Sequence, residues 1–455
     1  MNNKIDFTKN NILFFSNEQI DVDCDEYKKN GDFNRQKIRE KVEPWLTAVF
    51  QSEHLSLLIG SGLSTALIQN TTMMPRIEFS NSFKDLILRK ANEEAIKLDR
   101  GTANFEDDLR VAIELLKGFE IIGDSNKDEL RNEINTQLEK LLNSIIENEK
   151  KFLDKINNNA KLKDNENTSK NDQNNNQTIK DKNLLLLLEQ FLLSFSTRTA
   201  TRDRLNIFTT NYDRFIEYGL DEAGILTLDR FIGKLKPIMR FHRVDLDYHY
   251  NPPGIRGEPR YVEGVVRFTK LHGSIDWEFE GDQIVRIPLP FGEENVNESF
   301  FANSYDKVVI YPNSAKAVET AFFPYSELFR DFSTAICRPN SVLVTYGYGF
   351  GDSHINRIIL DMLTIPSTHL VIISYDLANG RIENFINKCN EAQLTLLIGN
   401  ELGNFESLTN YYLPKPAIDR ITDRQARLLE KRKIMTQAYP QDKEPLKGEN
   451  NESEF

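Results

Sequence analysis

The sequence contains very little cysteine, and its three cysteines, Cys24, Cys337 and Cys389, lie far apart in the chain. Their number is odd and no two of them form a Cys-x-x-Cys pair, so they provide neither a disulfide framework nor a four-thiolate zinc site. Such cysteine usage is typical of a protein from a reducing compartment. We therefore expect a protein that requires no metal.

Long apolar runs are also missing, because no stretch approaches the ~18 apolar residues that a membrane-spanning helix needs. The leucine run at 184–188 fits a buried helix face instead. Residues 1–15 contain no apolar core of the kind found in signal peptides. These features predict a cytoplasmic protein that makes no contact with a membrane.

An excess of basic residues is absent as well, since 57 basic residues stand against 69 acidic ones and give a net charge of -12. This balance argues against a protein whose main role is to coat nucleic acid, and we expect no direct nucleic-acid binding. Apolar residues make up 39% of the 455 residues, which is enough for a substantial core. The length favours one large domain with insertions.

Short apolar runs alternate with helical patterns through much of the chain. The runs are Leu55–Ile59, Leu205–Thr209, Val265–Leu271, Val308–Tyr311, Ser341–Tyr346, Leu370–Ser374 and Leu394–Ile398. Apolar strands that alternate with helices predict an α/β fold with a parallel, doubly wound sheet covered on both faces. Ligands bind to such sheets at the carboxyl ends of the strands.

Further regions flank or interrupt this alternation. Residues 1–50 are predicted to form an N-terminal helical extension, and residues 51–415 the main domain. Apolar stripes at helical spacing predict an inserted helical subdomain at about 80–200. Within it, residues 155–182 contain nine asparagines and no aromatic residue, which predicts a disordered linker. Residues 416–455 are predicted to form a C-terminal helix and a flexible tail.

A small-residue turn, Gly60-Ser-Gly-Leu-Ser64, follows the first apolar run directly. Such a turn between a strand and a helix lets backbone N–H groups approach a pyrophosphate, which a side chain at either glycine would block. A tight turn without a ligand explains the same residues, so this motif alone leaves both interpretations open.

A second polar motif, Thr209-Thr-Asn-Tyr-Asp213, follows the next apolar run. Asn211 offers both a donor and an acceptor, so it can hold a ribose hydroxyl or a water, and Asp213 can accept from an amide. The alternative is helix capping, with Asn211 or Asp213 as the N-cap residue.

Two further motifs end predicted strands. In Lys270-Leu-His-Gly-Ser274, His272 can accept a proton at neutral pH, although a single histidine often has only a structural role. In 345–356, three glycines at alternate positions are typical of a second phosphate- or ribose-binding turn, and Asp352 or Ser353 fits the cap of the helix that follows.

Together these motifs resemble the sirtuin superfamily. Gly60-Ser-Gly-Leu-Ser64 matches its GAG-x-S turn, Thr210-Asn-Tyr-Asp213 is similar to its QN-x-D motif, and His272-Gly273 matches its catalytic HG pair. Gly347 and the glycines after it stand where the family has a Gly-Ser/Thr turn. The resemblance is closest to bacterial antiphage-defence proteins, particularly the sirtuin-like subunit that partners a HerA-type ATPase.

The resemblance implies a sirtuin-like Rossmann domain that uses NAD as a substrate. It implies that Asn211 holds the ribose or the attacking water and that His272 is the base. It further implies NAD-binding roles for Gly60, Ser61, Gly62, Ser64, Thr210, Asp213, Gly347, Gly349 and Asp376. The family also implies a homo-oligomer and a hexameric HerA-type ATPase as partner.

Two departures from the family pattern narrow the expected activity. The four-cysteine zinc ribbon of the deacylating members is absent, and Thr71–Arg76 does not match their GIPDFR segment. We therefore expect an NAD hydrolase of an antiphage system that acts by NAD depletion. The alternatives are a non-hydrolysing NAD-sensing assembly subunit and, less favoured, an NAD-dependent protein deacylase.

Overall fold

The computed structural model describes residues 5–68, 76–80, 82–97, 102–163, 184–198, 202–241, 247–250, 260–292, 307–310 and 323–415. The chain divides into two units, residues 1–414 and 415–455. All elements below belong to the first unit. The predicted C-terminal helix and tail at 416–455 lie outside the described residues.

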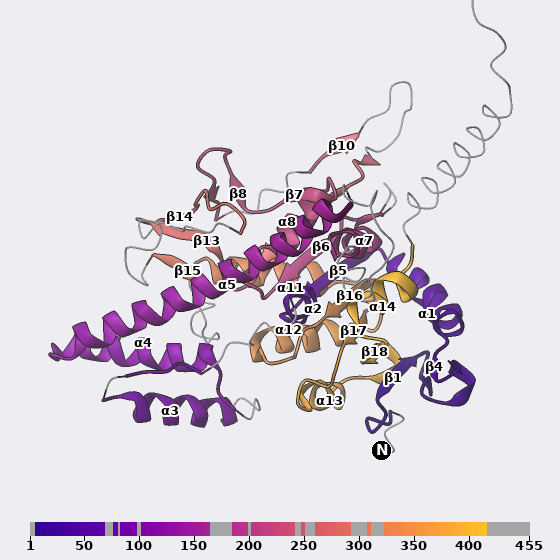
Figure 1. The fold of residues 1–455 in the computed structure, drawn as a ribbon, viewed down its shortest axis with the longest axis horizontal. Helices are drawn as coiled ribbons and strands as arrows, with labels where there is room; N and C mark the ends of the chain where they lie inside the picture. The colour runs from indigo at the N-terminus through magenta and orange to yellow at the C-terminus, as the bar shows by residue number, and fades with distance from the viewer. Residues whose placement is uncertain are drawn as a thin grey trace, which may run out of the picture. The chain divides into compact units, whose positions relative to one another are not determined.

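A nine-stranded sheet forms the centre of this unit, in the order β2-β1-β18-β17-β16-β5-β6-β12-β7 (Figure 1). Its strands are β1 (Asn11–Phe15), β2 (Glu18–Ile20), β5 (His54–Ile59), β6 (Asn206–Thr209), β7 (Leu226–Leu228), β12 (Val265–Lys270), β16 (Ser341–Tyr346), β17 (His369–Ser374) and β18 (Leu394–Gly399). From β18 to β7 every neighbouring pair is parallel, whereas β1 runs antiparallel to β18 and β2. The predicted α/β fold with a mainly parallel sheet is confirmed.

Helices cover both faces of this sheet. One face packs against α1 (Arg35–Phe50), α2 (Gly62–Leu67), α7 (Leu184–Ser196), α8 (Phe215–Glu222), α14 (Phe405–Ser407) and η3 (Leu408–Tyr412). The other face packs against α11 (Tyr325–Ile336), α12 (Ser353–Leu363) and α13 (Arg381–Ile386). In β5, Leu57 belongs to the first core and Leu58 to the second, because successive side chains of a strand point to opposite faces. Burial on both faces explains why these strands appear in the sequence as continuous apolar runs.

The helical insertion consists of α3 (Lys84–Lys97), α4 (Phe105–Ile122) and the first part of α5 (Lys127–Lys163), which share a core of their own. Helix α5 then continues toward α8 (Figure 1), where the Phe152 and Phe215 rings lie 5.2 Å apart. Helix α7 packs on the main sheet rather than in the insertion, contrary to the predicted boundary near 200.

The predicted disordered linker at 155–182 was wrong over 155–163, which belong to α5. An existing helix gains one hydrogen bond for each residue that it adds, so it extends into a polar segment that would not start a helix alone. The rest of the predicted linker, residues 164–182, lies outside the described residues.

A second, antiparallel sheet has the order β15-β13-β14-β9-β8. Its strands are β8 (Phe231–Ile232), β9 (Ile238–Met239), β13 (Gly273–Glu280), β14 (Gln283–Arg286) and β15 (Val308–Ile310). The apolar run at 308–311 was expected in the parallel sheet, but β15 pairs with β13 instead. A short apolar run does not encode which sheet it joins, because that depends on partners distant in sequence.

The N-terminal 50 residues are only partly helical, which corrects the predicted helical extension. Helix α1 is present, but β1 and β2 extend the main sheet and β3 (Lys28–Lys29) pairs with β4 (Asp32–Phe33). The alternation in the sequence there is too short to reveal β1, whose partner β18 lies almost 400 residues further along. Minor elements are η1 (Asp25–Tyr27), η2 (Glu391–Gln393) and the pair β10 (His249–Tyr250) and β11 (Arg260–Tyr261). Within the described ranges, no helix has the length and apolar character to cross a membrane.

Candidate functional site

The predicted motifs meet at one edge of the main sheet, at the carboxyl ends of β5, β6, β12 and β16. These four strands are neighbours, with β5 between β6 and β16. The chain builds the sheet outward from β5, first toward β6 and β12 and later toward β16 and β17. The edge next to β5 is therefore a topological switch point, where doubly wound sheets bind their ligands.

The Gly60–Gly62 turn packs directly against the turn at Gly347. The backbone N–H of Gly60 donates to the carbonyl of Tyr346 and that of Gly62 to the carbonyl of Gly347, each at 3.0 Å. A Cβ atom on Gly60 would lie 2.5 Å from the Gly347 carbonyl oxygen, and one on Gly62 2.5 Å from the Gly347 Cα. Gly347 itself has a φ of +59°. Close approach of two backbones thus requires these glycines, beside any role in binding a ligand.

Asn211 joins the first turn to the motif after β6. Its side-chain Nδ2 donates to the Gly60 carbonyl and to Ser64 Oγ, both at 3.1 Å. Ser64 Oγ in turn donates to Asp213 Oδ2 at 2.5 Å. The capping interpretation was wrong, because Arg214 occupies the N-cap of α8 and no side chain caps that helix.

Two side-chain oxygens at this cluster, one from an amide and one from a carboxylate, receive no hydrogen bond from the described residues. Asn211 Oδ1 and Asp213 Oδ1 are both buried, and neither has a hydrogen-bond partner in the described part of the chain. Leaving such an atom unsatisfied costs about 1–3 kcal/mol, so each requires an explanation. A ligand that carries hydroxyl and primary-amide donors, as NAD does, would satisfy both atoms.

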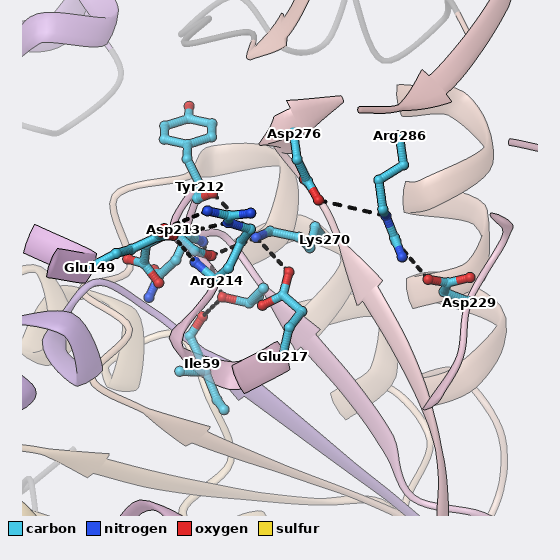
Figure 2. A network of polar contacts seen from close by, with 12 residues as sticks. Ile59, Glu149, Tyr212, Asp213, Arg214, Glu217, Asp229, Lys270, Asp276 and Arg286 are labelled. Carbon is cyan, nitrogen blue, oxygen red and sulfur yellow. Dashed lines mark hydrogen bonds and ion pairs between the residues drawn. The ribbon is translucent and has the colours of Figure 1, made fainter. Parts of the chain in front are cut away.

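Buried charges set the electrostatics around Asp213. Burial raises the pKa of Asp213 to about 6, although the Lys270 ammonium and the hydrogen bond from Ser64 oppose the rise. Lys270 is itself buried, and its Nζ donates to the Asp213 carbonyl at 2.5 Å and to Glu217 Oε1 at 2.8 Å. Figure 2 shows Asp213, Lys270 and Glu217 in one network of polar contacts.

The same network ties the motif to the helical insertion. Glu149 of α5 is fully buried and forms an ion pair with Arg214 at 2.6 Å (Figure 2). Glu149 Oε1 also accepts from the Arg214 backbone N–H at 3.0 Å. Tyr212 Oη donates to Glu106 of α4 at 3.0 Å. Both residues that flank Asp213 are therefore held by α4 and α5.

His272 lies at the junction between β12 and β13, where the chain passes from the main sheet to the second sheet. Only 5% of the residue is exposed, so His272 is buried in the structure. Its Nε2 lies 3.0 Å from Asp352 Oδ2. Asp352 also caps α12, since its Oδ1 accepts from the N–H groups of His354 and Ile355.

The other predicted site residues lie around this centre. Thr210 donates its backbone N–H to the Ile59 carbonyl at 3.2 Å, and Ser61 is exposed at the start of α2. Gly349 lies against the segment after β17, where a Cβ would be 3.1 Å from an Arg381 nitrogen. Asp376 belongs to this segment but is exposed, and its carboxylate accepts from the Ala378 N–H at 2.7 Å.

Sequence reasoning missed the supporting charges, namely Glu149, Glu217, Lys270 and the pairing of Asp352 with His272. Asp352 was considered only as a cap of the helix that follows it. Its partner is 80 positions away in sequence, so only the fold could reveal the pair. No group of three or more His, Cys, Asp or Glu side chains in the described residues is placed to hold a metal ion.

Comparison with known protein families matches residues 205–394 to the SIR2-like domain. The match includes β6, β12 and β16 with the motifs after them, whereas the Gly60–Gly62 turn lies outside it. None of the curated proteins compared matches the chain significantly. SIR2-like domains are NAD-utilising enzymes. Over residues 205–394 the chain is thus similar to the SIR2-like domain.

Proposed function

We propose that this protein hydrolyses NAD to nicotinamide and ADP-ribose. The observation that carries the proposal is a pair of buried acceptors, Asn211 Oδ1 and Asp213 Oδ1, to which the described residues donate no hydrogen bond. Both lie at the switch point of the sheet and within the range that is similar to the SIR2-like domain. They offer acceptors for a ribose hydroxyl and for the nicotinamide carboxamide. The proposed contacts with NAD are made by the side chains of Asn211 and Asp213, and they do not involve a metal ion.

The reaction makes modest demands on the protein. The bond between the ribose C1′ and nicotinamide breaks, and nicotinamide leaves with the bonding electron pair, which neutralises its positive charge. The ribose passes through an oxocarbenium-like state, as in glycoside hydrolysis, before water forms the new bond at C1′. The proton that water loses is taken by a base and then released to solvent.

Asn211 and His272 are the residues to which we assign these tasks. Asn211 is fixed by its two donated hydrogen bonds to Gly60 and Ser64, so its acceptor has a defined direction toward a ribose hydroxyl or water. His272 is proposed as the base. Hydrolysis is favoured over protein deacylation because the chain cannot assemble a four-cysteine zinc ribbon from three cysteines.

The biological setting is proposed from the family resemblance. We infer that the protein is an effector of bacterial antiphage defence which acts by NAD depletion, and that a HerA-type ATPase controls it. Some control of the activity is also expected, because an NAD hydrolase that is always active would deplete the NAD of the cell that makes it.

The test is to incubate the full-length protein, alone and co-purified with a HerA-type ATPase, with NAD and to measure nicotinamide by chromatography. We expect nicotinamide and ADP-ribose in equal amounts. His272→Ala should lower kcat by about 10²–10⁴-fold, the usual contribution of a general base. Asn211→Ala should lower it by about 100-fold.

Asn390→Ala is the matched control, because Asn390 is an exposed residue whose side chain caps only the short η2 helix. It should keep wild-type activity, and thermal unfolding of every variant should confirm a folded chain. Intact NAD recovered under all conditions, together with measurable NAD binding, would replace this proposal with the non-hydrolysing sensor. An acyl-ADP-ribose product would indicate the deacylase.

A further inference from the structure

Asp352 and His272 form a buried pair that joins two motifs far apart in sequence. Their side chains are 7% and 6% exposed, and Asp352 Oδ2 lies 3.0 Å from His272 Nε2. The ring of Tyr212, next to Asn211, lies 6.2 Å from the His272 ring between centroids. The pair therefore lies beside Tyr212, the residue between Asn211 and Asp213.

Asp352 is held in place by the helix that it caps. Its Oδ1 accepts from the N–H groups of His354 at 3.0 Å and Ile355 at 3.4 Å, which leaves Oδ2 directed to His272. A carboxylate is the only side chain that presents two acceptor oxygens in this way. One oxygen fixes the residue on α12 while the other fixes the imidazole.

We propose that Asp352 is a positioning residue which sets the tautomer and orientation of His272, an inference that rests on the proposed NAD hydrolysis. A carboxylate accepts but does not donate, so it selects the imidazole form with its proton on Nε2. The proton-accepting nitrogen is then Nδ1. The carboxylate also stabilises the imidazolium that forms when His272 takes a proton from water.

Asp352→Asn separates the cap from the positioning role. The helix N–H groups require an acceptor, so the amide oxygen of the asparagine would cap α12 and its NH₂ group would face His272. That group donates to Nε2, so Nε2 must be unprotonated and the ring proton moves to Nδ1. Nδ1 is then no longer able to accept a proton from water. We expect kcat to fall by about 10²–10⁴-fold while KM changes less than threefold.

A second readout follows the imidazole itself. The chain has six histidines, so selective ¹⁵N labelling with assignment by a His272→Gln variant is practicable. Two-bond ¹H–¹⁵N spectra should place the His272 proton on Nε2 in the wild type and on Nδ1 in Asp352→Asn. This measurement needs no NAD and does not depend on activity.

The matched control is Asn404→Ala, since Asn404 caps α14 by accepting from the N–H groups of Glu406 and Ser407, in the same pattern as Asp352. It should lower stability by about 1 kcal/mol, as other cap removals do, without changing kcat or the His272 tautomer. A wild-type tautomer and kcat in Asp352→Asn would overturn the inference. A wild-type protein that fails to release nicotinamide would refute the hydrolase while the tautomer measurement still decides the role of Asp352.

Discussion

At the scale of single residues, the site is defined by polar atoms whose surroundings are unusual rather than by unusual residue types. Asn211 and Asp213 were expected at the site from their place after a strand. The sequence could not show that each would keep one buried oxygen that accepts no hydrogen bond from the described residues, because hydrogen bonding depends on every neighbour in three dimensions. His272 was likewise anticipated, whereas its pairing with Asp352 was not.

Asp213 gives a prediction for the pH dependence of stability. Its pKa is about 6 in the folded chain against an ordinary 3.8, so between these values the folded state holds a proton that the unfolded state has lost. Stability is therefore lost as pH rises through this window. Asp213→Asn should remove that loss, and its unfolding free energy relative to wild type should increase by about 2 kcal/mol from pH 4 to pH 7.

Urea unfolding at each pH measures this difference. Asp282→Asn, which changes an exposed carboxylate in the turn after β13, serves as the control and should follow the wild type across the range. Parallel curves for Asp213→Asn and wild type would show that Asp213 ionises normally in the folded chain.

At the scale of elements, the core strands and the helices that cover them could be predicted because each carries its signal locally. The run at 55–59 and the run at 341–346 are apolar throughout, as strands buried on both faces must be. Strand β15 and strand β1 were misassigned or missed because their short segments depend on partners far away in the chain. The Gly60 turn was found, but its packing against Gly347 required the fold.

Helix α5 connects the insertion to the candidate site, and Glu149 tests that connection. Glu149→Gln would leave the buried Arg214 guanidinium without its counter-charge, and such a break costs about 3–5 kcal/mol. Because Arg214 adjoins Asp213, we also expect weaker NAD binding, by about tenfold, in isothermal titration.

The control lies two positions away on the same helix. Glu147 is 63% exposed, and among the described residues it forms an ion pair with Lys151 one turn on, so Glu147→Gln should change stability by less than about 0.5 kcal/mol. Equal effects of the two variants on stability and binding would show that α5 does not hold the motif after β6.

At the scale of the whole molecule, we expect assembly into a homo-oligomer and a complex with a HerA-type ATPase. Both expectations come from the resemblance to defence proteins, since one chain carries no direct sign of its partners. Size-exclusion chromatography with light scattering checks them on the full-length protein, alone and after co-expression with the ATPase. A chain that stays monomeric at high concentration and elutes apart from the ATPase would contradict both.

The pairing of β1 with β18 has a consequence for how the protein is made. Asn11 faces Gly399 across that pair, so β1 and its partner are 388 positions apart. At about 5–20 residues per second, a ribosome needs roughly 20–80 s to make the intervening chain. During that interval β1 can form only its hairpin with β2, and its other edge is open to pairing with other nascent chains. The sheet is completed after translation has passed β18, and until then β1 presents an unpaired strand edge.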